Sequence, residues 1–167
     1  TITWNNKEFN HIYDAIVYSV FVSLGFATLE NIMYVFEGGI GTALLRSVLS
    51  VPGHVFFGVF MGYYYGLAKQ ASINGNQKLV NRNLYHSLLL PVLLHGTFNF
   101  LLMTQNVTMV LFYLVFVVFL YIQAIKRIRR FSNIKINLVE EKKVHCHNCG
   151  TRIDDMYCPR CGTKRII

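Results

Sequence analysis

Residues 107–130 have the sequence VTMVLFYLVFVVFLYIQAIKRIRR. The first part of this stretch, residues 107–125, contains no Asp, Glu, Lys or Arg and is about as long as the 20 or so apolar residues that a membrane-spanning helix needs. It runs directly into a basic cluster, Lys126-Arg127-Ile128-Arg129-Arg130. An apolar span that ends in such a cluster is typical of a helix that stops at the cytoplasmic face of a membrane.

The composition of the whole chain also indicates a membrane protein. Hydrophobic residues make up 53% and charged residues 14% of 167 positions, whereas soluble domains carry about 25% charged residues. The net charge of +8 is concentrated after residue 125, where 11 Lys or Arg face only 4 Asp or Glu. The basic character therefore belongs to the C-terminal part and not to the apolar part.

Three further segments resemble residues 107–125 in length and apolar character, and they lie at about 12–36, 43–68 and 84–103. The sequence therefore predicts an all-α membrane protein with about four transmembrane helices in a domain of residues 1–130. Residues 131–144 are polar and of mixed charge, and we expect them to be a linker to a small C-terminal module.

The connections between the spans predict the orientation in the membrane. The polar loop 69–83 carries three basic residues, whereas the glycine-rich turn 37–42 and the turn 104–106 carry none. Basic residues concentrate on the cytoplasmic side, so we expect the loop 69–83, the basic cluster and both termini to face the cytoplasm.

All four cysteines lie in residues 145–167, as Cys146-x2-Cys149-x8-Cys158-x2-Cys161, and each pair is followed by glycine. Two such turns direct four thiolates to one point, which favours a structural zinc ribbon with no open metal position. Two disulfides or a redox pair are the alternatives, and a cytoplasmic location argues against them. We expect the ribbon to recruit a cytoplasmic protein partner and not a nucleic acid.

Ionisable residues inside the predicted spans are the candidates for function, because such side chains are costly in a membrane. Glu30 lies in the first span, His54 in the second, and His95 and Asn99 in the third. His95 and Asn99 are four residues apart and therefore share a helix face. His54 continues a glycine face that allows close helix packing, at Gly58, Gly62 and Gly66.

One carboxylate and two imidazoles are the ingredients of two chemistries. Glu30, His54 and His95 could hold a zinc ion with one position left for water. Alternatively, Glu30 and a histidine could activate water without a metal. Asn99 could then orient the substrate or stabilise an oxyanion. Arg46, near the outer end of its span, is expected to be an anchor or a partner for a carboxylate.

At these residues the chain resembles the PrsW family of intramembrane proteases, which are relatives of the CAAX prenyl protease group. The resemblance covers most of residues 12–103. It rests on Tyr13-Asp14-Ala15, on Gly25-Phe26-Ala27-Thr28-Leu29-Glu30-Asn31-Ile32-Met33-Tyr34, on Arg46, on Ser50-Val51-Pro52-Gly53-His54, and on His95-Gly96-Thr97-Phe98-Asn99-Phe100. It implies proteolysis of membrane proteins, anti-sigma-factor-like substrates among them, in a bacterial or archaeal plasma membrane by a metallo- or glutamate-type site.

The sequence departs from the family pattern in one respect. The pattern has a Glu-Glu-x-x-Lys motif upstream of the Asp14 region, and Glu8 is a lone carboxylate in residues 1–13. A polypeptide without that motif would lack a general base and would be an inactive or incomplete enzyme. The alternatives to an intramembrane peptidase are therefore a catalytically inactive membrane adaptor and, less favoured without an internal repeat, a small transporter.

Overall fold

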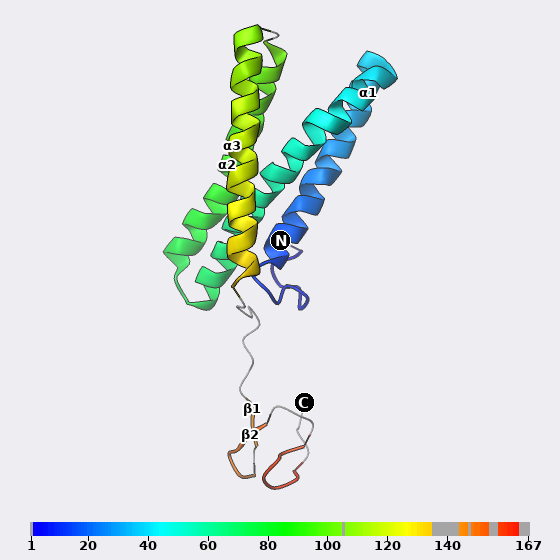
Figure 1. Ribbon diagram of the computed structural model, residues 1–167. Coiled ribbons are helices and arrows are strands. Elements are labelled where there is room, and N and C mark those ends of the chain that lie inside the picture. Colours follow the sequence, from blue (N-terminus) through cyan, green and yellow to red (C-terminus); the bar gives the residue numbers. More distant parts are fainter. Residues whose placement is uncertain (1, 105, 135–143, 147, 154–156, 164–167) are drawn as a thin grey trace.

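The structure is a computed structural model, and it describes residues 2–104, 106–134, 144–146, 148–153 and 157–163. Figure 1 shows its elements in chain order, which are α1 (Asp14–Ile73), α2 (Gln77–Met103), α3 (Val107–Ser132), β1 (Val144–His145) and β2 (Arg152–Ile153). Each of the three helices is long and apolar enough to cross a membrane. The predicted class, an all-α membrane protein with a small C-terminal module, is confirmed.

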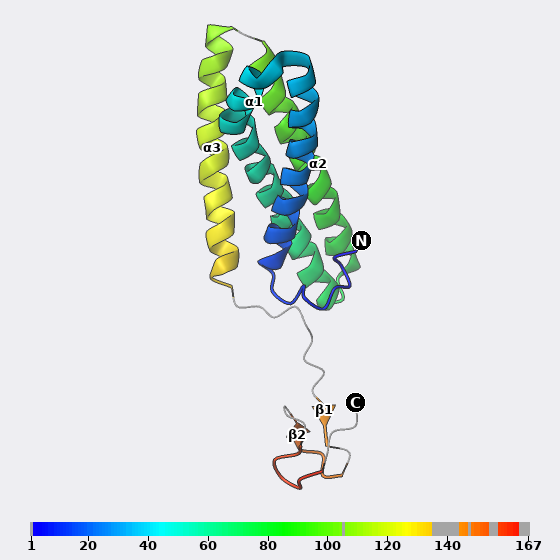
Figure 2. The same ribbon diagram turned by 90° about the vertical axis from the view of Figure 1, so that its right-hand side faces the viewer.

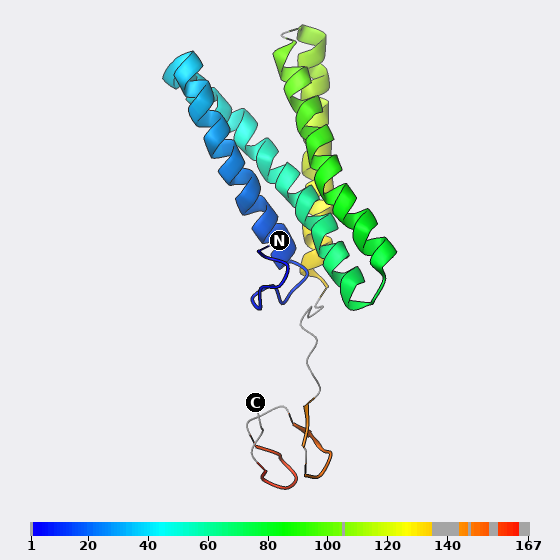
Figure 3. The same cartoon turned by 180° about the vertical axis from the view of Figure 1, so that it is seen from behind.

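Helix α1 is folded back on itself and supplies two of the four predicted spans. A straight helix of its 60 residues would be about 90 Å long, roughly three times the hydrocarbon thickness of a bilayer. The reversal is at Gly39, whose φ of 73° and ψ of −176° are not helical and which has no Cβ to oppose a positive φ. We call residues 14–38 the first arm and residues 40–73 the second arm. Figure 3 shows the second arm running back between the first arm and α2.

The helices extend beyond the predicted spans. Residues 69–83, expected to be a polar loop, are mostly helical, and the turn between α1 and α2 is only Asn74–Asn76. This turn is fixed locally, because Gly75 has a φ of 70° and the Asn76 side chain accepts a hydrogen bond from the backbone N–H of Leu79. Similarly, α3 continues through the basic cluster to Ser132. The ends are therefore set by capping residues and not by the membrane boundary.

The two arms of α1 pack backbone against backbone along the predicted glycine face. A Cβ on Gly58 would lie 2.7 Å from Cα of Val20, and a Cβ on Gly62 would meet the backbone of Ile16. His54, one turn before Gly58, is buried, and its carbonyl oxygen accepts a 2.6 Å hydrogen bond from the Ser23 hydroxyl on the first arm. The close approach thus places His54 against the first arm, away from lipid.

Figure 2 shows α2, α3 and the two arms of α1 side by side, and two clusters of buried side chains hold them together. One lies at the end where α1 begins, and it joins Phe9 and Ile12 of the N-terminal segment to Phe131 of α3. The other joins the second arm to α2 and α3 through Phe57, Phe98 and Tyr113. The second cluster matters for the site, because Phe57 packs against His95 with 5.3 Å between the ring centroids.

The glycine face gives the first testable prediction. Gly62→Ala should destabilise the protein by about 1–3 kcal/mol, because the added methyl group overlaps backbone that cannot move independently. Gly25→Ala is the matched control, because a Cβ there meets nothing within 4 Å and alanine favours the helix. Thermal unfolding in detergent micelles measures both variants. Equal unfolding temperatures would contradict the packing described here.

Candidate functional site

Glu30 of the first arm is at the centre of the site. Its Oε2 accepts a 2.9 Å hydrogen bond from Nη2 of Arg46 and lies 3.0 Å from Nε2 of His54. Its Oε1 lies 3.7 Å from Nε2 of His95. The side chain of Glu30 is 15% exposed. The structure therefore brings together the carboxylate and the two imidazoles that the sequence singled out on three different spans.

The two histidines lie against each other in an aromatic surrounding. Their ring centroids are 4.9 Å apart, and Phe26 of the first arm contacts both rings. His54 is almost completely buried, whereas the side chain of His95 is 23% exposed. Asn99 lies one turn beyond His95, with 3.1 Å between its Nδ2 and Nε2 of His95. This contact agrees with their spacing of four residues and places an amide beside the site.

Several residues contact Arg46 and fix its position, and Arg46 thereby fixes the position of the Glu30 carboxylate. Its Nε donates a 2.8 Å hydrogen bond to Oδ1 of Asn31, and its Nη2 lies 3.3 Å from Oγ of Ser50. The guanidinium also lies 3.8 Å from the ring centroid of Tyr34, which is a favourable cation–π distance. Of the two roles expected for Arg46, the structure shows the carboxylate partner. Asn31 is not among the candidate residues predicted from the sequence, although its polar side chain next to Glu30 inside a span is a signal for such a role.

Glu30, His54 and His95 fit a metal ion. One ligand atom from each residue lies within 4.8 Å of the others. Zinc bonds of about 2.0–2.1 Å in tetrahedral geometry place ligand atoms a little over 3 Å apart. The two imidazole nitrogens lie at similar distances from the carboxylate, 3.0 Å from Oε2 for His54 and 3.7 Å from Oε1 for His95. Two histidines and one glutamate are also the ligand set of a class of catalytic zinc sites.

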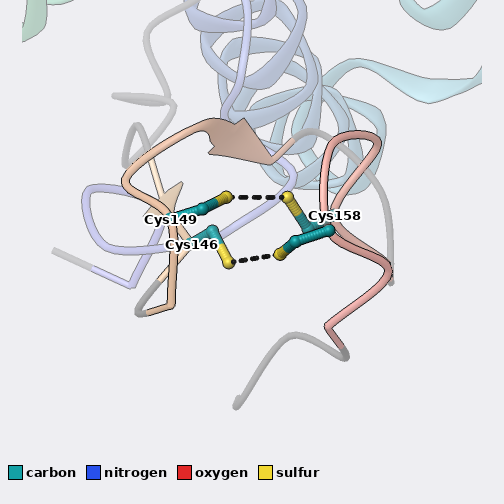
Figure 4. A group of neighbouring side chains, drawn as sticks. Cys146, Cys149 and Cys158 are labelled. Carbon is teal, nitrogen blue, oxygen red and sulfur yellow. Dashed lines mark hydrogen bonds between the residues drawn. The ribbon is translucent and has the colours of Figure 1, made fainter.

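The four cysteines form a second group that could hold a metal. The sulfur atoms of Cys149 and Cys158, labelled in Figure 4, lie 3.5 Å apart, and those of Cys146 and Cys161 lie 3.4 Å apart. All four Sγ atoms lie within 4.8 Å of one another, and all four thiols are free. Such an arrangement suits a tetrahedral site of four thiolates.

The two cysteine turns have the same backbone construction. In one turn the N–H of Cys146 donates a 2.8 Å hydrogen bond to the carbonyl of Thr151, and in the other the N–H of Cys158 donates a 2.9 Å bond to the carbonyl of Thr163. The glycine after each pair has a positive φ, 68° at residue 150 and 67° at residue 162. The Thr163 hydroxyl also lowers the pKa of the Cys161 thiol to about 6, which favours the thiolate that binds metal.

Comparison with known proteins identifies relatives of the helical part. The profile described as "PrsW family intramembrane metalloprotease" matches residues 1–124. "Protease PrsW" of Oceanobacillus iheyensis is 43% identical over 130 residues, which is 77% of this chain and 57% of that protein. "Protease PrsW" of Bacillus subtilis is 37% identical over 131 residues, or 78% of this chain and 58% of that protein.

A third relative, "Protease PrsW" of Geobacillus kaustophilus, is 46% identical over 103 residues, which is 62% of this chain and 44% of that protein. The chain thus spans about half the length of the curated relatives it matches. No solved structure matches it. The four cysteines lie outside residues 1–124.

Metal content tests the fit of the histidine site. A chain that ends at Val139 lacks the four cysteines, so any metal that it retains lies in the helical part. We expect about one zinc ion per chain after purification in detergent, measured by inductively coupled plasma mass spectrometry. His54→Ala should remove this zinc, and the exposed Ser47→Ala should not. A chain without bound metal would contradict a zinc site and favour activation of water by Glu30 and a histidine.

Proposed function

Because the chain belongs to the PrsW family of intramembrane metalloproteases, we propose that it is a peptidase that hydrolyses a peptide bond of a membrane-bound protein. The main support for this proposal is that Glu30, His54 and His95 lie close together. Oε2 of Glu30 is 3.0 Å from Nε2 of His54, and Oε1 of Glu30 is 3.7 Å from Nε2 of His95. The three long apolar helices and the bacterial relatives make it an integral membrane protein of bacteria.

The distribution of basic residues supports an orientation with both termini in the cytoplasm. In that orientation the reversal of α1 at Gly39 and the end of α2 at Met103 lie on the outer side. Glu30 and His95 are each within about three helical turns of those ends. Cleavage would then occur in the outer half of the bilayer, in a span or close to its outer end.

The residues of the site can supply each group that hydrolysis requires. Glu30 is placed to take a proton from water as the water oxygen attacks the peptide carbonyl carbon. The amide of Asn99 and the imidazole of His95 can donate hydrogen bonds to the carbonyl oxygen as negative charge develops on it. His54, 3.0 Å from the carboxylate, can return a proton to the amine that leaves when the C–N bond breaks.

Arg46 acts in this scheme as a positioning residue. Its hydrogen bonds to Glu30, Asn31 and Ser50 hold the carboxylate in one orientation, and its guanidinium places a positive charge beside that carboxylate. In the alternative with a metal, zinc would be held by Glu30, His54 and His95 in place of their proton-transfer and hydrogen-bonding roles, and it would supply Lewis-acid activation of water and of the carbonyl oxygen.

The C-terminal part is proposed to act separately from the site. Residues 1–130 would form the membrane domain and residues 145–167 a zinc ribbon that recruits a cytoplasmic protein, joined by a linker at 131–144. Most of that linker, residues 135–143, lies outside the described residues. Four thiolates close the coordination shell of a zinc ion, so the ribbon zinc would be structural.

An inactive membrane adaptor is the second candidate, and the ion pair of Arg46 and Glu30 favours it. A 2.9 Å ion pair between the two arms of α1 would stabilise the bundle without any chemistry. The exposed fraction of His95 argues for the peptidase, because a histidine that only joined helices would not need an accessible side chain.

Cleavage in reconstituted vesicles tests the proposal. The full chain is incorporated with a set of bacterial single-span membrane proteins, and new peptide ends are identified by mass spectrometry. His54→Ala and His95→Ala should each reduce cleavage by about 100-fold or more. Ser47→Ala, an exposed hydroxyl outside the contacts of the site, should retain it. Cleavage that is equal in all variants, or absent from the unmodified chain, would overturn the proposal.

A further inference from the structure

We propose that a cavity beside the candidate active site binds one apolar side chain of the substrate, next to the scissile bond, and that Leu49 and Leu102 set the size of the side chain it accepts. This inference rests on the proposed function and adds a substrate class to it.

The cavity adjoins the catalytic groups. It has a volume of about 360 Å³ and lies between the two arms of α1 and α2, at the end where α1 reverses. Arg46, Ser50 and Asn99 line it. Arg46 is hydrogen-bonded to Glu30, and Asn99 to His95, so a group in this cavity lies beside the carboxylate and the imidazole.

Two other cavities of similar size do not adjoin the site. One of about 280 Å³ lies between the second arm and α3, and one of about 370 Å³ lies between the arms and the first half of α2. Neither is lined by Glu30, His54, His95, Arg46 or Asn99. Of these three cavities, only the one at Asn99 could hold a substrate group next to the reacting bond.

The walls of the cavity predict the chemistry of its occupant. Beyond its polar end, the lining is mostly apolar, with one hydroxyl from Thr42 and the ring of Tyr34, and its other residues are Leu45, Leu49, Phe98, Leu102 and Met103. The guanidinium of Arg46 is already paired with Glu30 at 2.9 Å, so an acidic side chain would compete for that pair and disturb the site. An apolar side chain fills the space without removing any hydrogen bond.

The volume excludes an intact helix. It lies at the low end of the about 300–1,000 Å³ typical of ligand pockets, and a helix with its side chains is about 10 Å across. The cavity would therefore take one substrate side chain, next to the peptide bond that is attacked, and not enclose a whole helix.

Leu49 and Leu102 form two different walls of the cavity. Leu49 also lines the 280 Å³ cavity on the α3 side, so it stands between the two spaces. Leu49→Ala should join them and admit a larger side chain. Leu102 closes the cavity from α2, and Leu102→Trp should fill it and admit only a small one. Leu111→Trp on α3 is the matched control, because Leu111 is exposed and lines none of the three cavities.

The first measurement maps binding without cleavage. The full chain with Glu30→Gln is incubated in vesicles with a single-span peptide that carries a diazirine analogue of leucine near its outer end. Irradiation should label Leu45, Leu49, Leu102 or Met103, as located by mass spectrometry, and Leu102→Trp should reduce that label by about tenfold while Leu111→Trp does not. Label confined to other surfaces, or unchanged by Leu102→Trp, would overturn the proposal.

The second measurement uses chains with Glu30 intact and peptides with Ala, Leu or Trp at the same position. Leu49→Ala should raise cleavage of the Trp peptide relative to the Leu peptide by about tenfold, and Leu102→Trp should shift preference to Ala by a similar factor. Thermal unfolding confirms that each variant folds. If the cavity residues are labelled but the unmodified chain cleaves no peptide, the peptidase is contradicted and the binding cavity is still supported. If the peptides are cleaved but the variants keep the same preference among Ala, Leu and Trp, the cavity is contradicted and the peptidase is still supported.

Discussion

A carboxylate within a bilayer needs partners for its charge, and the Glu30 carboxylate has three. Oε2 is 2.9 Å from the Arg46 guanidinium and 3.0 Å from His54, and Oε1 is 3.7 Å from His95. Ionised groups at this depth are costly unless they are paired. The rest of the structure can be understood as the arrangement that supplies these partners from both arms of α1 and from α2.

Two features of the backbone make that arrangement possible. Gly39 reverses α1 after the first arm, so Arg46 returns alongside Glu30 within a short stretch of chain. The glycines at 58 and 62 then let the arms approach until backbone meets backbone, which brings His54 into reach of the carboxylate. A bulkier residue on this face would separate the arms and move the imidazole away from Glu30.

Much of this could be predicted from sequence, because apolar length and small-residue spacing are local properties. The spans, and the convergence of Glu30, His54 and His95, follow from counting residues along helices. Helix ends could not be predicted in the same way, since capping at Asn76 extends α2 beyond its apolar part. The contact of Asn31 with Arg46 depends on how the arms are rotated, which no single helix pattern determines.

The catalytic role of Glu30 is tested most directly by measuring both cleavage and thermal unfolding of the Glu30→Gln variant. The glutamine keeps an oxygen that can accept from Arg46 and His54, but it removes the negative charge and the base. We expect cleavage to be lost at temperatures at which the variant is still folded, although its unfolding temperature should fall because the Arg46 charge is left without its carboxylate partner. Retained cleavage, or a loss of folding that accounts for the lost activity, would contradict a catalytic role for Glu30 and favour a carboxylate that only joins the helices.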